Sequence, residues 1–151
     1  MTDTAAARTN ALGRPWLALC LALALHFAEE AHVGFLPVYE DAVRAVRELF
    51  PFVRSPSLAL AAGMWLAVGL VAALMAILPF AYRGAPWMRV ATIGLALITL
   101  ANVSGHIGGS ILAGRLMPGI YTIPLLAASG IYALAVAWRW RPVQSCGCEP
   151  A

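Results

Sequence analysis

One short segment places an imidazole and two carboxylates inside an apolar stretch. Glu29 and Glu30 follow His26 by three and four residues, and on an α-helix these offsets keep the three side chains within an arc of about 100°. The flanking residues are apolar. In a membrane, a charged side chain at such a position costs roughly 2.5 to 3.5 kcal/mol, so it normally faces a bundle interior or a wet cavity. We therefore expect a functional site here.

A second polar cluster lies in a later apolar stretch. Asn102 and His106 are four residues apart and belong to a polar stripe with the period of one helix face. Gly105 and Gly109 lie beside the stripe, in the small-xxx-small spacing that lets another backbone approach closely. We expect this glycine face to accept a neighbouring helix, including one from a second copy of the chain in a homo-oligomer.

The composition is that of a membrane protein. Of the 151 residues, 62% are hydrophobic and 11% are charged, and the mean hydropathy is +0.80. All ten basic residues are arginine, and they fall in the predicted tails and loops, as expected when the apolar stretches are in lipid. No basic face alternates with aromatic residues, so the sequence does not indicate nucleic-acid binding.

Four apolar stretches have the length needed to cross a hydrocarbon core of about 30 Å. They cover residues 15–34, 57–80, 87–113 and 120–138. Residues 38–50 have apolar side chains at helical spacing opposite charged ones, a pattern typical of a short helix in the membrane interface. The predicted fold class is therefore all-α: an integral membrane bundle of four transmembrane helices, with a short interfacial helix between the first and second spans.

The remaining residues are predicted to form tails around this single domain. We expect residues 1–14 to be a disordered N-terminal tail, residues 15–139 the four-helix domain, and residues 140–151 a C-terminal tail that carries Cys146 and Cys148 without an assigned role. Four spans place both termini on one side. Six arginines on that side against four on the other favour cytoplasmic termini in the cell (inner) membrane.

The two polar clusters are predicted to lie at the same depth. At a rise of about 1.5 Å per residue, His26 and Glu30 lie roughly 16 and 22 Å from the start of the first span. Asn102 and His106 lie roughly 18 and 24 Å along the third span, which runs in the same direction. If these two helices are neighbours, their polar side chains surround one site in the half of the membrane away from the termini.

Three motifs follow one another along the chain. They are His-x-x-Glu-Glu at residues 26–30, Asn-x-x-x-His at residues 102–106, and Arg115 followed by Pro-Gly-Ile-Tyr-Thr at residues 118–122. Over about residues 16–137 they resemble the HXXEE-domain family of small bacterial and archaeal membrane proteins. That family has no known function, so the resemblance implies a shared site and a four-helix plan without a reaction. The chain departs from the expected pattern at Met117, where an aromatic residue would be typical.

The side chains of the candidate site suit zinc or ferrous iron. Neutral imidazoles with one or two carboxylate oxygens are ligands of both metals and leave a coordination position open. We expect a divalent metal held by His26, His106 and either Glu29 or Glu30, with the other glutamate acting as general base and Asn102 orienting the substrate. Glu29, Glu30 and Asn102 are thus the candidate catalytic residues. The depth of the site favours a lipid or isoprenoid-like substrate.

Three other functions use the same residues, and the sequence leaves them open. A metal-free isomerase or cyclase would use the carboxyl groups and imidazoles as proton donors and acceptors. A proton- or ion-coupled transporter would need a polar path across the bilayer, which the second and fourth stretches do not offer. A structural polar lock would only join the first helix to the third, through bonds worth about 0.6 kcal/mol each.

Overall fold

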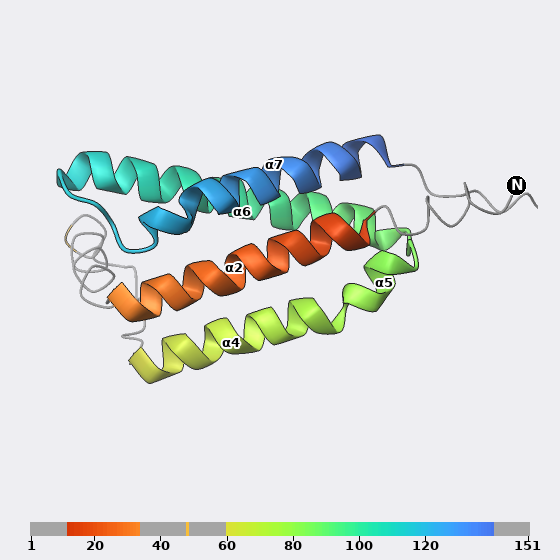
Figure 1. The fold of residues 1–151 in the computed structure, drawn as a ribbon, viewed down its shortest axis with the longest axis horizontal. Helices are drawn as coiled ribbons and strands as arrows, with labels where there is room; N and C mark the ends of the chain where they lie inside the picture. The colour runs from red at the N-terminus through yellow and green to blue at the C-terminus, as the bar shows by residue number, and fades with distance from the viewer. Residues whose placement is uncertain (1–11, 34–47, 49–59, 141–151) are drawn as a thin grey trace, which may run out of the picture.

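The structure is a computed structural model that describes residues 12–33, 48 and 60–140. All regular secondary structure in these residues is helical (Figure 1). The helices are α2 (Gly13–Val33), α4 (Leu60–Ala76), α5 (Leu78–Tyr82), α6 (Trp87–Ala113), the 3₁₀ helix η1 (Ile120–Thr122) and α7 (Ile123–Arg139). This confirms the predicted all-α fold class.

Four helical segments are long and apolar enough to cross a membrane. They are Gly13–Val33, Trp65–Tyr82, Trp87–Ala113 and Ile120–Arg139, with 21, 18, 27 and 20 residues. At about 1.5 Å per residue three of them have roughly the length of a 30 Å hydrocarbon core, and the span of 27 residues is about 10 Å longer. The four-span bundle predicted from the sequence is therefore confirmed. The predicted tails lie largely outside the described residues, and so does the predicted interfacial helix, of which only Glu48 is described.

The second span, predicted over residues 57–80, is divided into two helices. Helix α4 ends at Ala76 and α5 begins at Leu78, with Ile77 between them. Pro79 lies in the first turn of α5. Proline has no N–H to donate, and its ring clashes with the carbonyl four residues earlier, so an uninterrupted helix through this position is disfavoured. In Figure 1 α5 accordingly leaves the direction of α4 and leads the chain toward the start of α6.

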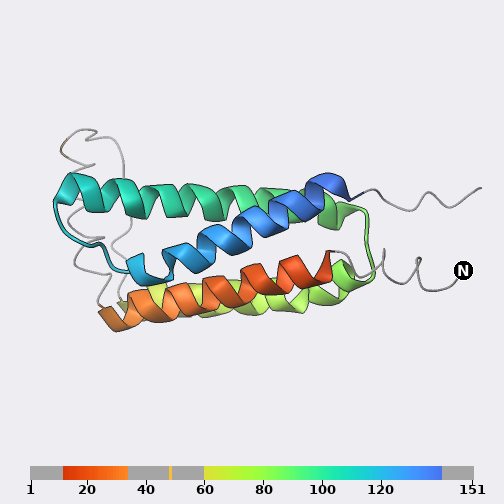
Figure 2. The ribbon, with the colours of Figure 1, turned by 45° about the horizontal axis from the view of Figure 1, so that its top comes forward.

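Helix α7 holds the bundle together. It packs against both α6 and α2, while α4 and α5 pack against α2; Figures 1 and 2 both show α7 lying across α6 and α2. Two cross-helix hydrogen bonds support the end of the bundle where α2 begins: Trp16 Nε1 donates to the Leu74 carbonyl at 2.9 Å, and Arg89 Nε donates to the Ala137 carbonyl at 3.1 Å. The first bond joins the start of α2 to the end of α4, and the second joins the start of α6 to the end of α7.

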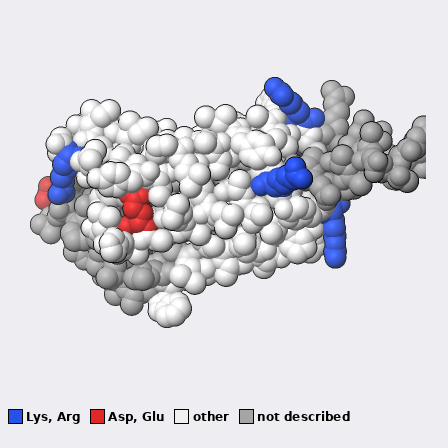
Figure 3. All heavy atoms as spheres, viewed as in Figure 1, with Lys and Arg blue, Asp and Glu red and all other residues white. Residues whose placement is uncertain are grey.

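The surface has the charge distribution of a membrane-spanning bundle. Figure 3 shows arginine at the two ends of the molecule and a wide uncharged belt between them, interrupted by an acidic patch near the end of α2. The belt exposes large apolar side chains, which at this density mark a lipid-facing surface. They include Trp65, Val90, Ile98, Ile111 and Trp138. The start of α2 and the end of α7 lie at the same end of the bundle, as four spans require.

Candidate metal centre

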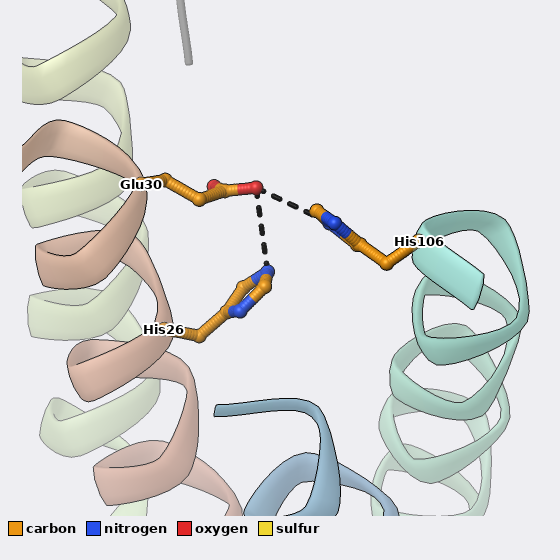
Figure 4. Close-up of side chains that lie close together, drawn as sticks. All are labelled: His26, Glu30 and His106. Carbon is orange, nitrogen blue, oxygen red and sulfur yellow. Dashed lines mark ion pairs between the residues drawn. The ribbon is translucent and has the colours of Figure 1, made fainter. Parts of the chain in front are cut away.

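Two helices that are far apart in the sequence carry the polar cluster. His26 and Glu30 lie one turn apart near the end of α2, and His106 points toward them from α6 (Figure 4). Both imidazoles are buried, with 1% and 7% of the residue surface exposed for His26 and His106. Because α7 packs against both helices, it sets the spacing between the two sides of the cluster.

One carboxylate oxygen lies between the two imidazoles. Glu30 Oε1 is 3.4 Å from His26 Nε2 and 3.2 Å from His106 Nε2, the two contacts dashed in Figure 4. The two rings meet edge to face, with centroids 4.9 Å apart. A ligand atom from each of the three residues lies within 4.8 Å of the other two. The structure thus places three potential metal-ligand atoms, two imidazole nitrogens and one carboxylate oxygen, around one small volume.

Two of the three separations between these atoms are compatible with tetrahedral ligands of one metal ion. Charge-assisted N–H···O⁻ hydrogen bonds are ordinarily about 2.7 to 2.9 Å long. Ligand bonds of about 2.0 to 2.2 Å in tetrahedral geometry put neighbouring ligand atoms about 3.3 to 3.6 Å apart. The two distances at Glu30 Oε1, 3.2 and 3.4 Å, are nearer to this tetrahedral separation. The residues present therefore fit a divalent metal held by His26, Glu30 and His106.

Asn102 lies beside Nε2 of His26, the ring nitrogen that faces Glu30. Its amide nitrogen is 3.1 Å from His26 Nε2 and donates to the lone pair that a metal ligand would use. The polar contact of His106 is also at Nε2, because its Nδ1 is buried without a hydrogen-bond partner in the described part of the chain. Both rings therefore direct the same nitrogen, Nε2, into the cluster.

Glu29, the other glutamate of the sequence motif, faces a different partner. Its carboxylate accepts hydrogen bonds from the backbone N–H groups of Tyr121 at 3.1 Å and Thr122 at 2.8 Å. These are N–H groups in the first turn of η1, where a helix has unpaired donors and a positive dipole end. Glu29 is not among the residues whose ligand atoms lie within 4.8 Å of one another. Its assignment as a metal ligand or catalytic residue stays a prediction.

Gly119 is a residue of the site that sequence reasoning did not single out. Its φ is +86°, and a Cβ on it would lie 2.6 Å from His26 Cε1, 3.1 Å from Glu30 Cγ and 3.2 Å from His106 Cε1. The backbone of the turn before η1 therefore packs directly on all three candidate ligands. The Pro-Gly pair at residues 118–119 was a signal for a turn, but not for a turn against the site.

The glycine face on α6 is only partly free. A Cβ on Gly109 would contact Met117 Cε at 3.4 Å, whereas a Cβ on Gly105 would meet nothing within 4 Å. Met117, the position where the sequence departs from the expected aromatic residue, thus covers Gly109 from the same chain. Self-association through the Gly105 and Gly109 face stays a prediction.

Comparison with known proteins identifies the family of this chain. A family model described as a protein of unknown function with HXXEE motif matches residues 16–133. The curated proteins and the solved structures give no match. The matched range covers well over half of the 151 residues, contains His26, Glu29, Glu30 and His106, and confirms the resemblance drawn from the three motifs. The chain belongs to the HXXEE family of proteins of unknown function.

Proposed function

We propose that this protein is an intramembrane metalloenzyme whose centre binds zinc or ferrous iron through His26, Glu30 and His106. The observation that carries the proposal is the position of Glu30 Oε1, 3.4 and 3.2 Å from two imidazole nitrogens. Two imidazoles and one carboxylate are the protein ligands of many catalytic zinc sites and of non-haem iron sites, both of which keep a position open for substrate.

The charge balance also supports a metal. Glu30 lies in the last turn of α2, where the helix dipole disfavours a negative charge by about 0.3 to 1 kcal/mol. The side chains beside it in the described part of the chain are two histidines, and a histidine carries a charge only when it is protonated. Interhelical polar bonds average only about 0.6 kcal/mol, and a charge in the membrane costs up to roughly 2.5 to 3.5 kcal/mol at the helix centre. A divalent cation would compensate the carboxylate directly.

The chemistry that a bound metal supplies is Lewis-acid polarisation of a substrate oxygen. The residues around it have separate tasks in this proposal. If His26 Nε2 held a metal, Asn102 would lose its hydrogen bond to that nitrogen, worth about 1 kcal/mol. Its amide would then be free to orient the substrate. Glu30 is the carboxylate at the centre, and Glu29 holds the turn that closes the site.

The position of the site favours a lipid or isoprenoid-like substrate. Glu30 is three residues before the end of α2, only about 4.5 Å along the helix axis, so the centre lies near the membrane boundary opposite the chain ends. Its side chain is 13% exposed, and the acidic patch near the end of α2 adjoins the uncharged belt (Figure 3). We propose a substrate whose polar head reaches the centre while its apolar tail stays in the bilayer.

An apolar groove lies on the side of α2 that faces α4, whereas the polar cluster faces α6. The groove has a volume of about 370 Å³. Phe27 lines the groove, and its ring centroid is 6.0 Å from that of His26. The other lining residues are small or aliphatic: Ala24, Ala28, Ala31, Ala67, Val68, Val71 and Ala72. Alanine side chains leave room for a chain between the two helices.

Metal content tests the proposal directly. The protein is purified in detergent through a tag without histidine, and metal per chain is measured by elemental analysis for the wild type, His26→Ala and His106→Ala. The matched control is His32→Ala, which removes an exposed histidine from the same helix. We expect about one zinc or iron per chain in the wild type and the control, and loss of the metal in the other two variants.

Two results would contradict the proposal. One is a folded wild type without metal, which would favour the metal-free acid-base enzyme. The other is metal retained in both His26→Ala and His106→Ala. The substrate class is tested by incubating wild type and His106→Ala with vesicles of total bacterial lipid and comparing lipid species by mass spectrometry. We expect one lipid or isoprenoid species to be consumed only by the wild type.

A further inference from the structure

The contacts of the Thr122 hydroxyl bear on which nitrogen of His26 carries the proton. Thr122 Oγ1 lies 3.0 Å from the Gly119 carbonyl, which can only accept a hydrogen bond, and a hydroxyl has only one hydrogen to donate. When that hydrogen is donated to Gly119, Thr122 Oγ1 is the acceptor in its 2.8 Å contact with His26 Nδ1. The ring nitrogen Nδ1 is then the donor and carries the proton.

A neutral imidazole has one N–H, so a proton on Nδ1 leaves a lone pair on Nε2. Nε2 is the atom 3.4 Å from Glu30 Oε1 and 3.1 Å from the Asn102 amide nitrogen, which donates to a lone pair and not to a second N–H. Metal-binding histidines normally donate their other ring N–H to a partner that fixes both the tautomer and the ring orientation. Thr122 occupies that place.

Thr122 is itself held by Glu29. The Thr122 backbone N–H donates to Glu29 Oε2 at 2.8 Å, and the Tyr121 N–H donates to Glu29 Oε1 at 3.1 Å. These bonds place both carboxylate oxygens on the first turn of η1, so that α2 fastens the start of the last span. The hydroxyl of Thr122 is thereby kept within reach of the His26 ring.

We infer that Thr122, anchored by Glu29, is a positioning residue that fixes His26 in the tautomer with a free Nε2 lone pair facing Glu30 and His106. The two adjacent glutamates then divide the work: Glu30 lies at the centre, and Glu29 holds the residue that orients one of its ligands. The consequence for metal affinity rests on the proposed function, whereas the tautomer itself does not.

The tautomer is measured on metal-free protein. Histidine labelled with ¹⁵N on the ring reports the protonation of each nitrogen, and the three histidines are assigned with the alanine variants. At mildly alkaline pH we expect His26 of the wild type and of Thr122→Ser to carry its proton on Nδ1. Thr122→Val has a similar shape but no hydroxyl, and we expect it to lose this preference. A wild-type proton on Nε2, or an unchanged tautomer in Thr122→Val, would overturn the inference.

Zinc affinity is measured by competition with a chromophoric chelator. Loss of a partner that orients a ligand typically weakens metal binding about 10- to 100-fold, and we expect this loss in Thr122→Val, with Thr122→Ser close to the wild type. Thermal unfolding without metal shows whether Thr122→Val folds. Equal affinities in Thr122→Val and the wild type, or equal losses in both variants, would overturn the role of the hydroxyl.

The two measurements separate two kinds of failure. A wild type that binds no zinc would refute the proposed metalloenzyme, yet the ¹⁵N measurement would still decide whether Thr122 sets the His26 tautomer. A wild type that binds zinc, with an unchanged affinity and tautomer in Thr122→Val, would leave the metal centre in place and refute only the positioning role.

Discussion

Glu29 and Glu30 are neighbours in the chain, but a step of about 100° around α2 separates their directions. Glu30 turns toward the two imidazoles, and Glu29 turns toward the first N–H groups of η1. A negative charge near the end of α2 is thus matched by the positive start of another helix. The two glutamates of the motif therefore contact two different partners on either side of one turn of α2.

Substitution by glutamine should lower zinc affinity by different amounts at the two glutamates. Glu30→Gln leaves a neutral amide at the centre, and we expect zinc affinity to fall at least about 100-fold, or ~2.8 kcal/mol. Glu29→Gln keeps one acceptor oxygen for the η1 N–H groups, and we expect it to bind a full equivalent of zinc with an affinity lowered less than in Glu30→Gln. Isothermal titration with zinc measures both. Equal losses would mean that both carboxylates are ligands.

The turn between α6 and η1 is the element that closes the site. Gly119 adopts a left-handed φ of +86°, and its backbone lies against His26, Glu30 and His106. Only glycine adopts this conformation without strain and also leaves no side chain to collide with the three ligands. The turn is therefore part of the wall of the site as well as a connection between two spans.

Alanine at this glycine should disrupt the turn and the centre together. Gly119→Ala adds strain of about 1 to 2 kcal/mol from the left-handed backbone. The Cβ would also lie 2.6 Å from His26 Cε1. We expect the free energy of unfolding to fall by about 2 to 4 kcal/mol and zinc binding to be lost, as measured by denaturant unfolding in detergent and by elemental analysis.

Gly94→Ala is the matched control for this substitution. Gly94 is inside helix α6, and a Cβ there would meet nothing within 4 Å. Alanine is favoured over glycine in a helix interior by roughly 0.5 to 1 kcal/mol, so this variant should be as stable as the wild type or slightly more. If Gly119→Ala were as stable as Gly94→Ala and bound zinc, the close packing of the turn on the ligands would be refuted.

The site lies at one end of the molecule, and the start of α2 and the end of α7 lie at the other. The start of α2 and the end of α7 lie together (Figure 1), and Glu30 lies three residues from the opposite end of α2. In the proposed function, the orientation of the protein in its membrane would decide which leaflet supplies the substrate.

We predict that the termini are cytoplasmic and that the site faces the outer half of the membrane. The arginine bias is six on the terminal side against four on the other, and the side richer in arginine normally stays in the cytosol. A C-terminal green fluorescent protein fusion should fluoresce in cells, and a C-terminal alkaline phosphatase fusion should be inactive. The reverse pattern would place the site in the cytoplasmic half and change the pool of lipids that reaches it.

The all-α fold, the four spans and the depth of the two polar clusters all follow from local properties of the sequence. Apolar stretches must match the bilayer thickness, and the helical period places residues three and four apart on one side. His26, Glu30, Asn102 and His106 are therefore recognisable as one candidate cluster from residue types and spacing. The break of the second span near Pro79 is harder to predict from the sequence. A proline near the end of an apolar stretch can mark either the end of the helix or the first turn of another helix.

The contacts within the cluster depend instead on tertiary packing. The contact of His26 with Thr122 joins residues 96 positions apart, and that of Glu29 with the Thr122 N–H joins residues 93 apart. No local pattern specifies such contacts, because they depend on α7 packing against α2 and on a left-handed glycine that brings the turn onto the ligands. Helical periodicity places side chains on a face, but only the packed bundle determines which partner each one meets.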